Sequence, residues 1–135
     1  VDGWSQHIDK VMRAYGNHII QSVVFVLEGE FGVEAKELAL CILYNIAAGD
    51  VAKDAIMTND DLLRKISNYM MASNAPLQIA SLSCITNLVY KDDPGANERL
   101  TKLIDLGLYK ILDQLPKTSN VIAEKVKNCL QQFCG

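Results

Sequence analysis

The side chains that could act as nucleophiles, bases or metal ligands are few and scattered along the chain. It carries two histidines and four cysteines: His7, His18, Cys41, Cys84, Cys129 and Cys134. The cysteines form no CxxC pair, and no HExxH, GxSxG or phosphate-loop pattern occurs. This pattern favours a protein that is not an enzyme and needs no metal or cofactor.

The cysteines have a simpler interpretation as small hydrophobic side chains. All four are set in helix-forming sequence, and the first residues lack the basic-then-apolar order of a secretion signal. We therefore expect reduced cysteines that pack in the interior. The chain begins at Val1 rather than Met, so we also expect it to be part of a longer protein.

Two pairs of adjacent carboxylates, Asp60-Asp61 and Asp92-Asp93, could in principle bind a cation. Neither pair has the spaced acidic ligands of a calcium loop. Both stand where a helix or a turn begins, so helix capping or a solvated turn explains them.

Composition narrows the classes of function. The 135 residues suit one domain, and half of them are apolar, but no uninterrupted apolar run reaches the eighteen or more residues of a membrane span. The net charge is -3, with both signs well mixed. The sequence contains no basic stripe that would bind nucleic acid and no basic amphipathic face that would bind a membrane surface.

The spacing of apolar residues predicts helices almost throughout. Ala35, Leu38, Ala39, Ile42, Leu43 and Ile46 follow the three-four alternation of a one-sided helix, with Ile42, Leu43 and Ile46 at the centre of its buried stripe. Capping residues, prolines and glycines divide the chain into nine predicted helices. These are 5–14, 17–28, 34–48, 50–57, 60–72, 76–90, 96–105, 107–115 and 119–133.

An internal repeat organises these helices. Shifting the stripe at Leu38 and Leu43 by 42 residues gives Ala80 and Ile85, and the same shift carries Asn45 onto Asn87. A further shift of 45 carries Asn87 onto Gln132, although Lys125 interrupts the apolar pattern there. A period of this length with three helices per unit is typical of armadillo or HEAT repeats.

Two details favour armadillo over HEAT. The segment 43–47 resembles the Leu-x-Asn-Ile-Ala end of the third armadillo helix, with 85–89 a looser match, and Gly107 stands before a second helix. We therefore predict an all-α fold, a right-handed superhelical armadillo-type solenoid fragment of two to three repeats. The single domain, 1–135, would divide into a partial repeat (1–32), two repeats (33–75 and 76–118) and a terminal helix (119–135).

The third helices of such a solenoid line a groove that binds other proteins. At 100° per residue, the outward positions of the first two copies form the candidate groove. They are Glu37, Cys41, Tyr44, Asn45, Ile79, Ser83, Thr86, Asn87 and Tyr90. Asparagines at such positions commonly bond an extended ligand in armadillo proteins, but an amide could equally bond the backbone of a neighbouring repeat. Tyr44 and Tyr90 could likewise anchor a partner or pack between repeats.

Four stretches, 14–21, 34–37, 52–61 and 84–88, point to a narrower family. They resemble the C-terminal repeats of the armadillo scaffold subunits of CTLH (GID-type) E3 ubiquitin ligases. Residues 52–61 are the most specific, because periodicity does not demand their polar side chains. The resemblance implies a non-catalytic scaffold in nucleus and cytoplasm that joins other ligase subunits, chiefly the substrate receptor, for ubiquitin-dependent degradation. The alternative is a generic peptide-binding adaptor of the importin or catenin kind.

Both ends of a short solenoid should expose apolar faces that further repeats would cover. We therefore expect self-association through the N-terminal end.

Overall fold

The computed structural model describes residues 2–134, with eight α-helices and no strand among them. The helices are α1 (Asp2–Glu28), α2 (Val33–Ile46), α3 (Asp50–Met57), α4 (Asp60–Met70), α5 (Ala75–Leu88), α6 (Ala96–Asp105), α7 (Leu108–Gln114) and α8 (Asn120–Cys134). The predicted all-α fold class is therefore confirmed for these residues.

Most predicted helix ends agree with the structure because local signals set them. The Asn59 side chain accepts a hydrogen bond from the Leu62 amide, and Asn74 does the same for Leu77, so both act as N-caps. The predicted bounds of 50–57 and 96–105 are confirmed, and five further helices differ from prediction by at most two residues at either end.

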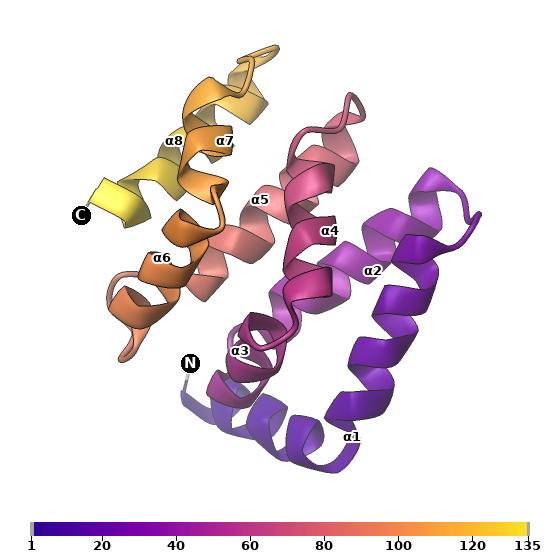
Figure 1. Ribbon diagram of the computed structural model, residues 1–135. Helices are drawn as coiled ribbons and strands as arrows, with labels where there is room; N and C mark the ends of the chain where they lie inside the picture. The colour runs from indigo at the N-terminus through magenta and orange to yellow at the C-terminus, as the bar shows by residue number, and fades with distance from the viewer. Residues whose placement is uncertain (1, 135) are drawn as a thin grey trace.

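The predicted break between helices 5–14 and 17–28 is wrong, because α1 runs continuously through Gly16. Gly107 separates α6 from α7 with a left-handed backbone (φ 90°), whereas Gly16 lies inside the helix and has no positive φ. Figure 1 shows that α1 instead bends partway along its length. Gly16 therefore does not end the helix, because its backbone keeps a helical conformation.

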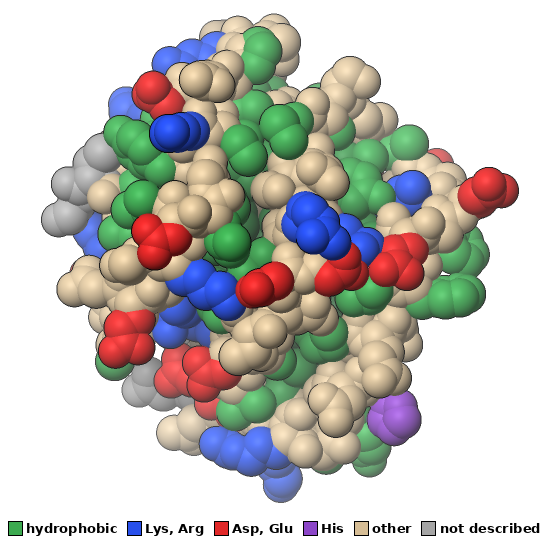
Figure 2. Space-filling model, in the orientation of Figure 1, with side chains coloured by type: hydrophobic (Ala, Val, Ile, Leu, Met, Phe, Trp, Pro, Cys, Tyr) green, Lys and Arg blue, Asp and Glu red, His purple; other side chains and the backbone are tan. Residues whose placement is uncertain are grey.

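The helices form two layers. In one layer α5 packs between α2 and α8. The other contains α4 and α7 with the second half of α1, and lies in front of the first in Figure 1. Figure 2 shows charges of both signs across the middle of this front layer. Lys65 of α4 forms ion pairs with Glu28 and Asp61. The hydrogen bond from Lys65 lowers the pKa of Asp61.

The sequence period reappears as the separation between bonded residues. Ser5 Oγ donates to the Ala48 carbonyl (43 residues apart), Tyr69 Oη donates to Leu27 (42 apart) and Cys84 Sγ lies 3.3 Å from the Leu40 carbonyl (44 apart). Equivalent helices therefore lie side by side, one period apart.

The core lies between the layers and along the row of α2, α5 and α8. Leu40 and Leu43 of α2 and Leu82 and Ile85 of α5 are fully buried. Ile42, predicted at the centre of the stripe, is 46% exposed, and that part of the prediction is wrong. Within residues 2–134, no helix equivalent to α5 or α8 packs against the side of α2 that carries Ile42. The opposite side of α2 packs on α5.

Candidate interaction surface

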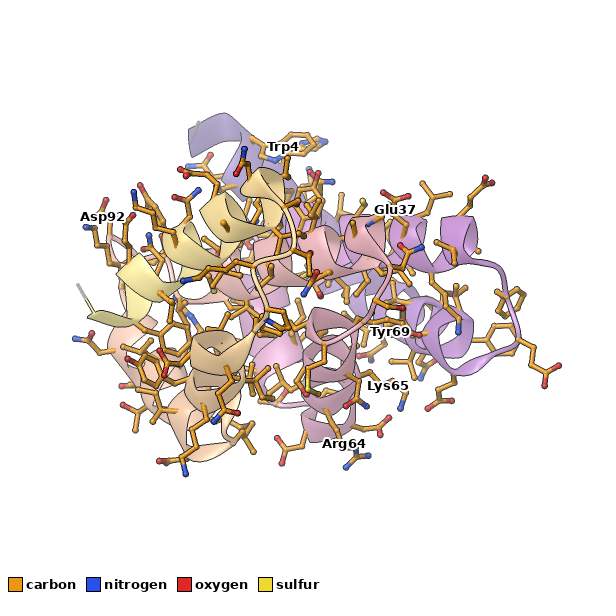
Figure 3. All side chains as sticks on the ribbon, turned by 90° about the horizontal axis from the view of Figure 1, so that it is seen from above. Trp4, Glu37, Arg64, Lys65, Tyr69 and Asp92 are labelled. Carbon is orange, nitrogen blue, oxygen red and sulfur yellow. The ribbon has the colours of Figure 1, made fainter. Side chains whose placement is uncertain are left out.

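The predicted groove residues lie on α2, on α5 and just beyond the end of α5; we call the surface of α2, α5 and α8 the third-helix surface. Asn45 and Tyr90 are exposed. The remaining seven are half-buried: Glu37, Cys41, Tyr44, Ile79, Ser83, Thr86 and Asn87. Figure 3 shows Glu37 projecting on the side opposite Arg64 and Lys65, which belong to the front layer.

The side chain of Asn87 joins two helices of the stack. Its Nδ2 donates to the Tyr44 carbonyl of α2 at 2.7 Å, across 43 residues. At the equivalent position of α8, Gln132 Oε1 accepts a hydrogen bond from the Lys91 amide at 2.9 Å. These amides bond the backbone of a neighbouring unit, which is the second of the two roles that the sequence left open.

Two more of the predicted residues face neighbouring helices. Tyr44 packs against the core, and Thr86 shares a side-chain hydrogen bond with Cys129 of α8 while donating to the Leu82 carbonyl of its own helix. The accessible part of the candidate groove therefore consists of Glu37, Cys41 and Asn45 on α2, Ile79 and Ser83 on α5, and Tyr90. Whether this strip binds a partner stays a prediction.

The described cysteines are free thiols in unreactive surroundings. Cys84 and Cys129 are buried; burial raises the pKa of Cys84 far above its usual range and that of Cys129 to about 11, the latter against a lowering by a hydrogen bond with Thr86. Cys41 is half-buried, and burial, followed by the charge of Glu37, raises its pKa too. A raised pKa disfavours the nucleophilic thiolate. The side chain of Cys134 lies outside the described residues.

Two apolar hollows flank the open side of α2, and the sequence analysis missed both. One, of about 470 Å³, lies between the first half of α1 and α2, and Trp4, Val11 and Cys41 are among its lining residues. The other, of about 570 Å³, lies between the second half of α1 and α2, with Ile19 and Val26 in its wall. Leu38 and Ile42 form the ridge between them, and Leu38 is 65% exposed.

A buried ion pair was also missed. Lys53 on α3 is only 3% exposed, and its Nζ lies 2.7 Å from Asp93 Oδ2 in the loop before α6. Asp93 had been interpreted as part of a solvated turn, which the structure corrects. No sequence signal marks Lys53 as buried, because the loop that covers it lies 40 residues away.

Within residues 2–134, no three His, Cys, Asp or Glu side chains gather into a group that could hold a metal ion. None of the helices in this range has the length and apolarity needed to cross a membrane.

With its stacked helices α2, α5 and α8 and bonds that recur at one period, the chain resembles armadillo-repeat proteins. It is 48% identical over 128 residues to armadillo repeat-containing protein 8 of Pongo abelii, and 47% identical to that of Mus musculus, in each case over 94% of this chain. The protein of the same name from Danio rerio is 44% identical over the same share. The chain spans 19% of the length of each of these curated relatives. No family model matches the chain, and no solved structure does.

Proposed function

We propose that the chain is the receptor-recruiting part of a non-catalytic scaffold subunit in a CTLH-type ubiquitin ligase. The observation that carries the proposal is the similarity to armadillo repeat-containing protein 8 along 94% of the chain. The scaffold acts in nucleus and cytoplasm. It holds the substrate receptor near ligase subunits that perform ubiquitin transfer.

The accessible strip of the third-helix surface is the proposed contact. Ile79 supplies an apolar contact, and Tyr90, which is 46% exposed, supplies an aromatic one. Glu37 is the acidic residue of the strip, and the amide of Asn45 donates to the Cys41 carbonyl of its own helix. Such a mixture suits a partner segment bound by shape and hydrogen bonds, because interfaces of this kind are apolar at the centre and polar at the rim.

A binding assay tests the strip. The double variant Glu37→Arg/Ser83→Arg places two bulky cations on adjacent third helices. The control, Asp113→Arg/Asn68→Arg, makes the same kind of change at exposed positions of α7 and α4. Affinity for the purified substrate receptor is measured by calorimetry, after circular dichroism has confirmed folding.

We expect the strip variant to bind the receptor at least ~10-fold more weakly, a loss of about 1.4 kcal/mol, and the control to bind as the wild type does. Equal losses in the two variants, or none in the strip variant, would remove the strip from the proposal. A wild-type chain that ignores the receptor but binds short charged peptides would instead support the generic adaptor.

A further inference from the structure

Two loops of successive units lie at the same edge of the molecule. Residues 71–74 join α4 to α5 and residues 115–119 join α7 to α8, as Figure 1 shows. Between these loops lies a hollow of about 550 Å³, which we call the loop hollow. Its walls include the exposed Met71 and the half-buried Ile111, and every side chain that lines it is uncharged.

The internal repeat identifies the equivalent residues of α1, α4 and α7. A shift of 43 residues carries Val23 and Leu27 of α1 onto Ile66 and Met70 of α4, and all four are buried. The shift of 45 that relates α5 to α8 also carries Met70 onto Leu115, which is buried just after α7. The contact between α1 and α4 can therefore be compared with the contact between α4 and α7.

A tyrosine closes the contact between α1 and α4. Tyr69 Oη donates to the Leu27 carbonyl at 2.9 Å, and Lys36 Nζ lies 5.9 Å from the centre of the Tyr69 ring. Lys65 of α4 adds an ion pair with Glu28 of α1 at 3.0 Å. An aromatic ring with a hydroxyl donor therefore fills the space between these two units.

The contact between α4 and α7 lacks both of these links. The residue equivalent to Tyr69 is Gln114, which is exposed and lines the loop hollow. The ion pair is missing as well, because Glu28 corresponds to the apolar Met71. The loop hollow therefore lies at the place that the Tyr69 ring fills one unit earlier.

A buried amide lines the loop hollow. Gln78 is 7% exposed, and its Nε2 donates to the Met70 carbonyl, which is equivalent to the Leu27 carbonyl that Tyr69 bonds. Within residues 2–134, no hydrogen bond is made to Gln78 Oε1, and no side-chain oxygen shielded from solvent lacks a partner. Solvent therefore reaches Oε1 through the hollow that Gln78 lines. An amide oxygen in this position can accept a hydrogen bond from an O–H or N–H group.

We propose that the loop hollow binds a tyrosine side chain of a partner protein, whose hydroxyl donates to Gln78 Oε1. The ring lies against Met71 and Ile111, since a thioether contacts aromatic rings favourably and tyrosine is common at interfaces. A charged side chain is disfavoured, because the uncharged walls offer nothing to offset its desolvation. The loop hollow shares no residue with the strip proposed for the substrate receptor, so the two sites can be tested separately.

A titration followed by NMR tests the loop hollow. The probes are acetyl-Ala-Tyr-Ala-amide and the same peptide with phenylalanine or glutamate at its centre. Gln114→Tyr supplies the ring from the chain itself, and Lys110→Tyr, at an exposed position of the same helix, is its control. Met71→Lys, at a residue 52% exposed, places a charge in the wall, and Leu106→Lys, 45% exposed and outside the hollow, is the control for that variant.

We expect the tyrosine peptide to shift the amide signals of 71–74 and 115–119 and to bind about 5-fold more tightly than the phenylalanine peptide, as one hydrogen bond would give. The glutamate peptide should not bind. Gln114→Tyr should abolish binding of the tyrosine peptide and raise the urea midpoint, Met71→Lys should weaken binding at least ~10-fold, and both controls should match the wild type. Equal binding of the three peptides, signal shifts confined to other surfaces, or full affinity in either hollow variant would overturn the proposal.

Discussion

At the scale of single residues, polar side chains form the contacts that join consecutive units of the stack. Lys53 pairs with Asp93, and Lys102 bonds the Met57 carbonyl and lies 2.8 Å from Asp60. Lys53, Met57 and Asp60 all belong to the stretch 52–61, whose polar residues the helical period does not demand. The ion pairs explain the residue types of Lys53 and Asp60, whereas Met57 contributes only its main-chain carbonyl.

The Lys53–Asp93 pair should be important for stability. Because Lys53 is buried, Asp93→Asn leaves its charge without its nearest carboxylate, and we expect a loss of about 3 kcal/mol in the free energy of unfolding. Urea denaturation measures it. The neighbouring exposed Asp92→Asn is the control and should change stability by less than about 0.5 kcal/mol. Similar losses for both variants would show that the ion pair contributes no more to the free energy of unfolding than an exposed carboxylate does.

The cysteines should differ in reactivity according to their burial. At pH 8 we expect iodoacetamide to modify Cys41 at least ~10-fold faster than Cys84 or Cys129, because burial blocks access and raises the pKa of Cys129 to about 11. Peptide mass mapping separates the sites, and in urea all three should react alike. Rapid labelling of Cys84 in the folded chain would contradict the buried position.

At the scale of elements, local sequence predicted helices well and their surroundings poorly. Asn59 and Asn74 cap their own helices, so the ends of α4 and α5 could be predicted. The sequence predicted a helix boundary at both Gly16 and Gly107, yet Gly16 lies inside α1 and only Gly107 separates two helices. Glycine permits both backbone conformations, and packing selects between them. The exposure of Ile42 was unpredictable for a related reason: it depends on which helix stacks against α2.

The start of α3 depends on a residue from another helix. Its N-cap, Gly49, has no side chain to offer, and Asp9 Oδ1 of α1 accepts the hydrogen bond from the Val51 amide at 3.1 Å. A Cβ on Gly49 would lie 2.5 Å from that oxygen, so the close approach of α1 requires glycine here. No pattern within residues 49–57 reveals this dependence on Asp9.

Asp9→Ala should therefore weaken the contact between α1 and α3. We expect a loss of about 1 kcal/mol, the usual value of an N-cap, with faster amide exchange at Val51 and its neighbours. Thermal unfolding and hydrogen exchange give the two readouts. Lys10→Ala, an exposed neighbour, serves as the control. If Asp9→Ala left exchange in α3 unchanged, the cap would have to come from elsewhere.

The whole molecule has two different ends. The α2 end exposes Leu38 and Ile42. The α8 end places the exposed Lys127 and Gln131 where α2 has the buried Leu40 and the half-buried Tyr44. The repeat pattern predicted apolar faces at both ends. Lys127 prevents this at the α8 end, because an exposed ammonium is strongly hydrated and costly to bury without a partner.

Removing the polar groups of the α8 end should therefore allow the chain to self-associate through that end. Lys127→Leu/Gln131→Leu restores the apolar pattern of the earlier third helices beside the half-buried Leu130. Sedimentation velocity should then show concentration-dependent association stronger than that of the wild type. Lys110→Leu/Gln114→Leu makes the same substitutions at the same spacing on exposed positions of α7, where no third helix stacks, and should sediment as the wild type does. Association in the control pair alone, or in neither, would mean that the polar residues of α8 do not close the stack.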